Sequence, residues 1–246
     1  MNLLDRYEQA LMGSREVLAK SEAMSTLLST DASPQLLHGW MLHFSAFGVR
    51  MTEPVEDWIT RAGKRCQELG MEELGRELIG HAHGEAGHHQ MMIEDARLFA
   101  AGWERNHGRA IDTDALIART DIEPVDRYRE LHEEVIRSDS PFRQLAIEYE
   151  IEMLSVAQGA PLVARCLERL PEDTKPGLSF LAEHAELDVG HTQFNRSRMA
   201  KFFDRYPQHY LAMVQTGRRS LDAYLGFIEV CLESTRQLIA QDELAA

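Results

Sequence analysis

A histidine and carboxylate pattern occurs in "LAEHAELDVGHTQF", the stretch that ends at Phe194. His184, Asp188 and His191 follow one another at i, i+4 and i+7, so on a helix they fall within an arc of about 60° on one face. Imidazole nitrogens and carboxylate oxygens are ligands for divalent first-row metals, iron and zinc among them. The same spacing also fits an exposed polar face, so a metal site here needs partners from elsewhere in the chain.

A second histidine-rich stretch, "GHAHGEAGHHQ", offers such partners. Glu85 and His88 have the Glu-x2-His spacing that di-iron carboxylate bundles place on inward-facing helices. His81, one turn before Glu85, and His89, four residues after it, compete with His88 as ligands. His83 falls on another face of the expected helix and is predicted to lie at the surface.

The third stretch, "LAIEYEIEMLSVAQGAP", carries glutamates in an otherwise apolar run. Carboxylates are costly to bury without a compensating cation. Glu152 is surrounded by apolar and small residues and is the preferred ligand. Glu148, one turn earlier, is the alternative.

Together the three stretches supply three carboxylates and three imidazoles. The set consists of Glu85, His88, Glu152, His184, Asp188 and His191. A catalytic zinc commonly takes three protein ligands, so six suit two irons that share carboxylates and keep open positions. The sequence therefore predicts a two-metal site, with no catalytic side chain beyond the ligands.

The elements that must position these residues are predicted to be helices throughout. Ser33-Pro34 and Ser140-Pro141 pair an N-cap serine with a proline at the first helical position, and Thr52 offers a third start of this kind. The expected helices span 3–28 (with Gly13 as the place of a break), 34–51, 53–69, 71–104, 123–138, 141–170, 176–204 and 207–240. Residues 102–120 read as a loop with one short helix. The connections are short, which predicts one all-α bundle of about seven to eight helices as a single domain over 1–246.

Composition limits the partners of the chain. Its formal net charge of −14 disfavours nucleic acid and anionic membranes. No segment approaches ~18 uninterrupted apolar residues, and the first residues lack the pattern of a signal peptide. Cys66, Cys166 and Cys231 lie far apart, so we expect buried packing residues in a reducing cytoplasm.

At its histidines and carboxylates the chain resembles the heme-oxygenase-like di-iron oxidases and oxygenases, a superfamily of iron-containing redox enzymes. The carrying motifs are "HGEAGHHQMMIED", "EMLSVAQGAP" and "EHAELDVGHTQF". The family places a Glu–His pair on a first helix, a lone glutamate on a second and His-x3-Asp-x2-His on a third. In this chain these would be Glu85, His88, Glu152, His184, Asp188 and His191. The last motif is the most specific of the three.

The resemblance implies a heme-oxygenase-like helical bundle that binds two non-heme irons and uses dioxygen as co-substrate. Such an enzyme would desaturate, cleave or oxygenate a small organic substrate, such as an amino acid or a fatty acid derivative. The short Glu-x2-His spacing is similar to that of members that decarboxylate fatty acids to terminal alkenes. A carboxylate-bearing substrate would need an arginine or lysine in the cavity. The resemblance also implies a homodimer and leaves room for an external electron donor.

Alternative interpretations remain at this point. Thiaminase-type and pyrroloquinoline-quinone-synthase-type relatives share the fold but need no iron. A ferritin-like bundle binds metal through carboxylates on another fold, but it typically repeats Glu-x2-His, whereas this chain shows it once. Heme would need a proximal histidine such as His38 or His43, and both are more typical of a core position beside Trp40 and Phe44.

Overall fold

The structure, a computed structural model, describes residues 1–245, apart from the side chains of residues 186–191 and 245. Over this part of the chain every regular element is a helix, as the sequence predicts. The α-helices are α1 (Leu3–Ala19), α2 (Glu22–Leu28), α3 (Pro34–Thr52), α4 (Val55–Glu68), α5 (Glu72–Ala82), α6 (His88–His107), α7 (Thr113–Ile117), α8 (Glu123–Arg137), α9 (Gln144–Leu154), α10 (Ala160–Arg169), α11 (Ser179–Arg205) and α12 (Tyr210–Ala245). They outnumber the expected seven to eight because three of the expected helices are divided and because the short helix α7 lies in the region 102–120.

The expected helix 3–28 is divided after Ala19 and not at Gly13. Helix α2 begins at Glu22, where Ser21 acts as N-cap and its Oγ accepts a hydrogen bond of 3.2 Å from the Met24 amide. A serine in this position satisfies an amide that has no partner within the helix. The local cap therefore decides where the chain turns, while Gly13 is accommodated inside α1.

The expected helix 71–104 is divided at residues 83–87, in the middle of the predicted metal-binding stretch. Helix α5 ends at Ala82, a single 3₁₀ turn covers His83–Glu85, and α6 begins at His88. Gly87 has φ of 84°, a left-handed conformation that glycine adopts at little cost. Glu85 and His88 are consequently brought together by a turn and not by one helix face.

The expected helix 141–170 contains a π-helical turn at Ser155–Gly159, between α9 and α10. Pro161 follows two residues later and lacks the amide that a regular α-helix would use there. Single π turns of this kind occur often at functional sites. This one begins three residues after Glu152.

Of the three helix starts predicted with a capping side chain, one is confirmed. Ser33 caps α3 as expected, with its Oγ accepting a hydrogen bond of 3.1 Å from the Leu36 amide. Thr52 does not cap a helix: α3 runs through it, and its Oγ1 donates to the Gly48 carbonyl at 2.8 Å. Ser140 precedes a 3₁₀ turn without a side-chain cap.

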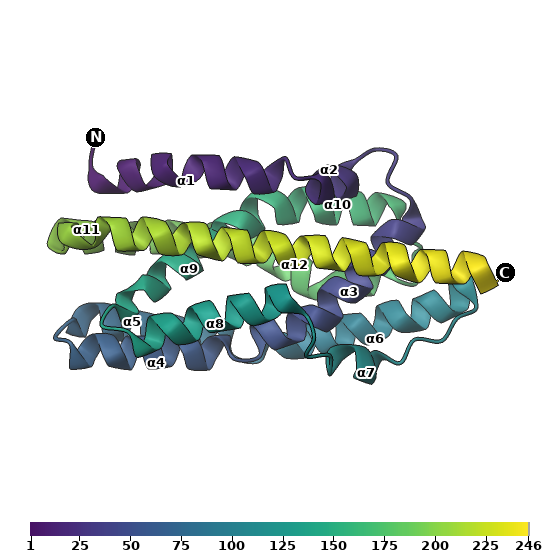
Figure 1. Ribbon diagram of the computed structural model, residues 1–246, viewed down its shortest axis with the longest axis horizontal. Coiled ribbons are helices and arrows are strands. Elements are labelled where there is room, and N and C mark those ends of the chain that lie inside the picture. Colours follow the sequence, from purple (N-terminus) through teal and green to yellow (C-terminus); the bar gives the residue numbers. More distant parts are fainter. Residues whose placement is uncertain (246) are drawn as a thin grey trace.

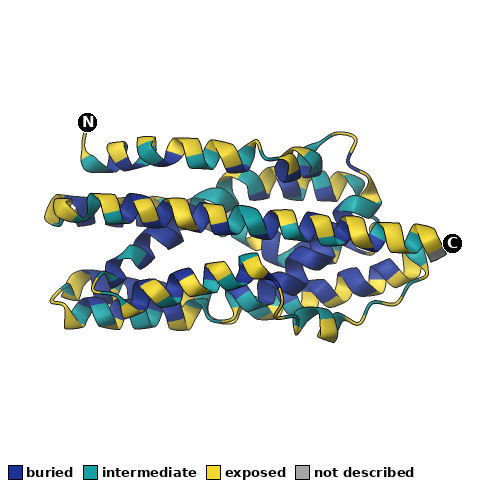
Figure 2. Cartoon of the chain, in the orientation of Figure 1, coloured by how far each residue is buried: buried dark blue, intermediate teal, exposed yellow. Residues whose placement is uncertain are grey.

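Two central helices, α3 and α9, are buried over most of their length and are covered by the others (Figure 2). Helix α12 runs along the whole molecule, with α1 on one side of it and α8 on the other (Figure 1). Helices α4 and α5 form an antiparallel pair. Helix α6 packs against α3, α11 packs against α9, and α5 packs against α4, so the histidines and glutamates of interest reach one region of the bundle.

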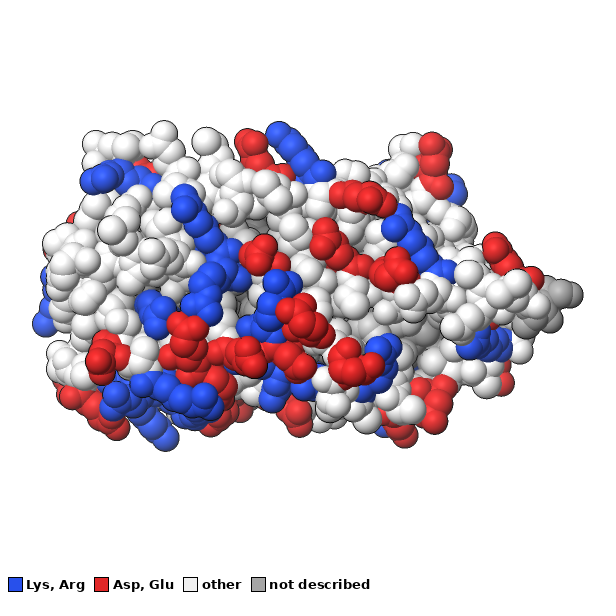
Figure 3. Space-filling view, viewed as in Figure 1, with Lys and Arg blue, Asp and Glu red and all other residues white. Residues whose placement is uncertain are grey.

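The surface carries charges of both signs. Over α8 and α12, basic and acidic side chains alternate (Figure 3), and Arg219 of α12 pairs with Glu134 of α8 at 2.6 Å. The helices within the described residues lack the length and apolar character that crossing a membrane requires.

Candidate metal centre

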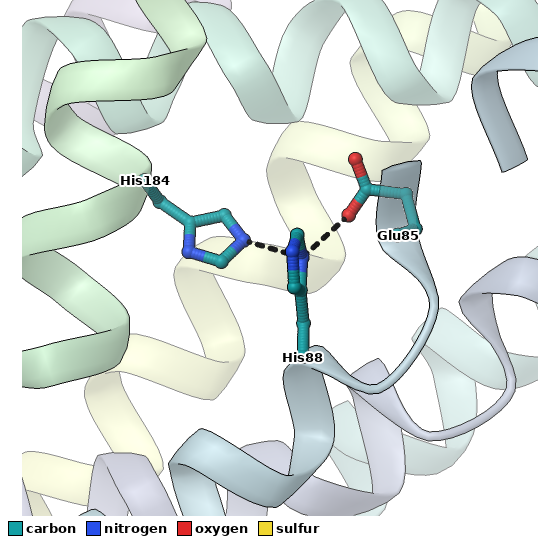
Figure 4. Close-up of side chains that lie close together, drawn as sticks. All are labelled: Glu85, His88 and His184. Atoms are coloured by element: carbon teal, nitrogen blue, oxygen red, sulfur yellow. Dashed lines mark hydrogen bonds and ion pairs between the residues drawn. The ribbon is translucent and has the colours of Figure 1, made fainter. Parts of the chain in front are cut away.

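Three metal-ligand side chains from separate segments meet inside the bundle: Glu85 of the 3₁₀ turn, His88 of α6 and His184 of α11. The His88 ring lies between the other two (Figure 4). Its Nδ1 is 3.1 Å from Glu85 Oε2 and 3.2 Å from His184 Nε2. One ligand atom from each residue lies within 4.8 Å of the others. Residues 96 positions apart in the sequence therefore present their donor atoms to one small volume.

The orientation of His184 is fixed by its own helix. Its Nδ1 lies 2.8 Å from the Phe180 carbonyl oxygen, and its ring stacks on the Phe180 ring with centroids 3.9 Å apart. A carbonyl can only accept, so Nδ1 carries the proton and Nε2 presents its lone pair to the group. This is the arrangement in which a backbone carbonyl sets the tautomer of a metal-binding histidine.

The start of α11 is anchored by a buried aspartate. Asp95 of α6 accepts hydrogen bonds from the Ser179 hydroxyl at 2.7 Å and the Phe180 amide at 2.9 Å. Burial raises the pKa of Asp95 to about 6, and these hydrogen bonds oppose the shift. Because Phe180 also holds His184, the aspartate ties the position of that imidazole to α6.

A second group of ligand atoms consists of His81, Glu85 and Glu152. His81 Nε2 lies 3.3 Å from Glu152 Oε1 and 4.0 Å from Glu148 Oε2. His81, Glu148 and Glu152 are buried, unlike the side chains of an ordinary surface cluster. Glu85 belongs to both groups, so its carboxylate lies between two sets of nitrogen and oxygen donors.

The two buried glutamates of α9 are each held by a neutral amide. Asn195 Nδ2 donates to Glu152 Oε2, and Gln144 Nε2 donates to Glu148 Oε1, each at 2.5 Å. Gln144 also contacts His132 Nδ1 at 2.8 Å. Each carboxylate thus has one oxygen fixed by an amide, while the other is the oxygen nearer to His81.

Behind Asn195 lies a buried arginine. Arg198 donates to Asn195 Oδ1 at 3.3 Å and to the Glu77 carbonyl at 2.8 Å, and its guanidinium lies 3.4 Å from the centre of the Phe194 ring. Burial lowers the pKa of Arg198 to about 10, while Glu77 and Glu152 act in the other direction. The arginine therefore connects α11 with α5 directly behind the Glu152 carboxylate.

The Glu85 carboxyl is held in its ionised form. Burial would raise its pKa, but the hydrogen bond from His88 and the proximity of His81, His88 and His184 outweigh burial and lower the pKa below its usual value. An ionised, buried carboxylate among imidazoles is suited to bind a cation.

The structure describes some of the site residues predicted from sequence and not others. His88 and not His89 faces Glu85, because His89 contacts Gln90 at the exposed side of α6. His83 is exposed, as predicted. The side chains of Asp188 and His191 lie outside the described residues, so their assignment stays a prediction.

Asn195, Gln144 and the full contribution of His81 were not predicted from sequence. Asn195 lies eleven residues after His184, which places it on the same face of α11. Gln144 precedes Glu148 by four residues, and His81 precedes Glu85 by four. Extending the i+4 and i+7 spacing from histidines and carboxylates to amides would have identified Asn195 and Gln144, whereas His81 follows from the spacing already used.

A cavity adjoins the candidate metal centre. It has a volume of about 130 Å³, and Glu85, Glu148, Glu152 and His184 line one part of it. The rest of the wall comes from aromatic, methionine and aliphatic side chains, with Thr52, Ser155 and Gln158 as polar members. A partly enclosed apolar space beside a few polar groups is the usual form of a small-molecule site.

The other histidines and the cysteines have packing roles. His38 Nε2 contacts the Phe99 carbonyl at 2.8 Å, and His43 Nδ1 contacts that of Gly39 at 2.8 Å. Burial lowers the pKa of both imidazoles. The cysteines are buried, and burial raises the pKa of Cys66 to about 12, which disfavours a nucleophilic thiolate.

The donor set fits a pair of first-row divalent metals. Two imidazoles and a carboxylate converge in one group, and an imidazole and two carboxylates converge in the other. Nitrogen and oxygen donors of this kind suit iron, manganese and zinc. A divalent cation bound among these imidazoles and carboxylates would compensate the negative charge of the buried glutamates.

The comparisons with known proteins address the fold. No protein-family model and no curated protein matches the chain. Among solved structures, a domain of unknown function with a heme oxygenase-like fold from Shewanella denitrificans matches with a TM-score of 0.74 at 15% identity, covering 98% of this chain and 96% of the other. A TenA homolog from Pseudomonas syringae matches with a TM-score of 0.67 at 15% identity, covering 93% and 92%.

A CADD-like protein of unknown function from Nostoc punctiforme matches with a TM-score of 0.58 at 15% identity, covering 93% of this chain and 98% of the other. At these identities the likeness shows the fold, and any chemistry has to be argued from the residues of this chain. The matches nevertheless extend over nearly the whole length of each protein. The all-α chain therefore has the heme oxygenase-like fold.

Proposed function

We propose that the protein is a non-heme di-iron oxidase or oxygenase that uses dioxygen to oxidise a small organic substrate. The observation that carries this proposal is the position of Glu85, which belongs to both groups of ligand atoms. A carboxylate with one donor set on each side is suited to bridge two metal ions. A single structural zinc would not need a second donor set that shares a ligand.

Within this proposal, Glu85, His88 and His184 would hold one iron, and His81, Glu85 and Glu152 would hold the other. Asp188 and His191 complete the ligand set, as the sequence predicts. When bound, the two irons supply the reduction of dioxygen and the oxidising power. The redox chemistry belongs to the metals, and the chain determines their position.

The described residues have three tasks in this function. The Phe180 carbonyl keeps His184 Nε2 unprotonated, and the amides of Asn195 and Gln144 fix one oxygen of Glu152 and Glu148. The apolar cavity wall excludes water and holds the substrate beside the metal-binding side chains. Repeated turnover requires an external electron donor.

Iron binding tests the proposal most directly. The full-length chain is freed of metal, titrated with ferrous iron without oxygen, and analysed for bound iron per chain. We expect two irons in the wild type. Glu85→Gln should weaken the binding of both, because Glu85 serves both groups, whereas His184→Gln should weaken mainly one.

The matched control is His83→Gln, two residues before Glu85 but exposed, which should bind iron like the wild type. A wild-type chain that binds no iron, or a Glu85→Gln variant that still binds two irons with unchanged affinity, would contradict the proposal.

A metal-independent enzyme is the alternative that one observation favours. Glu148 and Glu152 are buried in the cavity wall, where a carboxylate can serve as a general acid or base. The TenA homolog among the fold matches is compatible with this alternative. An activity that survives chelation and the Glu85→Gln substitution would decide in its favour.

A further inference from the structure

The wall of the cavity changes character with distance from the candidate metal centre. Its charged lining residues, Glu85, Glu148 and Glu152, all belong to the end beside His184. The described lining contains no lysine or arginine, and residues 186–191, Glu-Leu-Asp-Val-Gly-His, would add none. A charged group placed at the remote end would therefore lack a partner of opposite sign.

Rings and sulfur atoms make up much of the remaining wall, beside aliphatic side chains such as Val55, Leu162 and Ile228. The lining there includes Trp40, Phe44, Tyr224, Phe227, Met24 and Met51. Trp40 and Phe44 stack with ring centroids 4.8 Å apart, and Phe44 and Phe227 lie at 5.4 Å. Aromatic rings and methionine sulfur both make favourable contacts with another ring.

Two of the polar groups in this wall are already engaged. Trp40 Nε1 donates to the Ile228 carbonyl at 3.2 Å. Thr52 Oγ1 donates to the Gly48 carbonyl at 2.8 Å and contacts Met92 Sδ at 3.2 Å. A ligand consequently meets the faces of these side chains and not their hydrogen-bonding atoms.

The size of the cavity limits the occupant. At about 130 Å³ it is comparable with an engineered apolar cavity of about 150 Å³ that binds benzene. The extended chain of a fatty acid contains many more atoms than benzene and would not fit. An anionic amino acid side chain would fit by volume but would meet only carboxylates among the charged lining residues.

We propose that the cavity binds one uncharged aromatic ring, so that the substrate carries an aromatic group at the end remote from the metal-binding side chains. The reaction itself rests on the function proposed above, but binding of the ring does not. The sequence suggests an amino acid or a fatty acid derivative as substrate, whereas the cavity favours an aromatic compound over a long-chain fatty acid or an anionic amino acid.

Ligand binding to the full-length chain tests the proposal, with and without ferrous iron. Benzyl alcohol, benzoate and decan-1-ol are titrated calorimetrically. We expect one benzyl alcohol per chain in the metal-free protein. Benzoate should bind at least about tenfold more weakly than benzyl alcohol, because its negative charge would enter a cavity lined by carboxylates. Decan-1-ol should also bind more weakly, because it exceeds the cavity.

Two phenylalanine substitutions on α10 give a matched pair. Leu162 is buried and lines the cavity, whereas Leu167 is exposed. Leu162→Phe should weaken benzyl alcohol binding at least tenfold, and Leu167→Phe should leave it unchanged. Val55→Phe, which fills the cavity from α4, replaces Leu162→Phe if circular dichroism shows that the latter is unfolded.

The outcomes separate this proposal from the proposed function. The aromatic site would be overturned if benzoate or decan-1-ol bound as tightly as benzyl alcohol. It would also be overturned if neither cavity-filling substitution weakened the binding of benzyl alcohol. A chain that binds benzyl alcohol but no iron would overturn the di-iron function alone. A chain that binds two irons but no benzyl alcohol would overturn the aromatic site alone.

Discussion

Two buried carboxylates that α9 places beside the candidate metal centre accept hydrogen bonds from neutral amides. The third buried carboxylate of this helix does not. Glu148 and Glu152 are held by the amides of Gln144 and Asn195. Glu150, between them in sequence, forms two hydrogen bonds of 2.8 Å with Arg15 instead. An amide orients a carboxylate without cancelling its charge, whereas an arginine cancels it. The Arg15–Glu150 contact is therefore a structural ion pair, whereas Glu148 and Glu152 also lie beside the His81 imidazole.

Asp95 gives a prediction about pH at the level of a single residue. Its pKa of about 6 in the folded chain, raised by burial from 3.8, means that protonated Asp95 favours the fold relative to ionised Asp95. This contribution is complete below about pH 4 and is lost as the pH rises to 6 and beyond. The difference corresponds to about 3 kcal/mol.

Asp95→Asn removes this titration while keeping the size of the side chain. The unfolding free energy of the variant, compared with that of the wild type, should therefore rise by up to about 3 kcal/mol between pH 4 and pH 7. Urea denaturation at several pH values measures it. Asp139→Asn, at an exposed site, serves as the control with a constant difference. Parallel curves for Asp95→Asn and the wild type would show that the aspartate titrates normally.

At the level of the elements, local spacing accounts for part of the site. The face of α11 that carries His184 could be predicted, since ligands four and seven residues apart must share a side of a helix. The Glu85–His88 contact was predicted for the wrong physical reason. It depends on the turn that Gly87 permits, and a glycine inside a histidine-rich run does not reveal whether a helix continues.

The sharing of Glu85 between two groups could not be predicted from periodicity. It depends on how closely α5 approaches α4 and on where α9 lies relative to both. Gly63 of α4 and Gly75 of α5 permit that approach: a Cβ on Gly75 would lie 2.5 Å from the Gly63 carbonyl oxygen. Such long-range distances are set by packing, for which a single sequence offers no local signal.

The α4–α5 contact gives a prediction at this scale. Gly75→Ala should destabilise the chain by about 1–3 kcal/mol, because the added methyl group would push the two helices apart. The displacement should also weaken iron binding, since α5 carries His81. Thermal or urea unfolding and the iron titration measure the two effects.

Gly80→Ala is the matched control in the same helix. Nothing lies within 4 Å of a Cβ at Gly80, so the substitution should stabilise the chain by up to about 1 kcal/mol through helix propensity. Equal effects of the two substitutions would show that the close approach of α4 and α5 does not constrain the fold.

At the level of the whole molecule, an ion pair is one of the contacts that join α1 to the interior. Arg15 of α1 and Glu150 of α9 are 135 residues apart in sequence, and Glu150 is fully buried while the Arg15 side chain is 25% exposed. Burial raises the cost of any unpaired charge at Glu150, but an unpaired Arg15 can reach water. The two partners should therefore respond differently to substitution.

Arg15→Met should destabilise the chain by about 3 kcal/mol, because it leaves a buried carboxylate without its cation. Glu150→Gln should cost less than about 1 kcal/mol, since the amide still accepts a hydrogen bond and the arginine remains partly solvated. Arg15→Met combined with Glu150→Gln should regain most of the loss. Urea denaturation of the three variants measures this asymmetry, and equal losses for both single substitutions would mean that the pair acts as an ordinary surface ion pair. Because α9 also carries Glu148 and Glu152, an iron affinity that stays unchanged in the double variant would separate the anchoring of α1 from the metal centre.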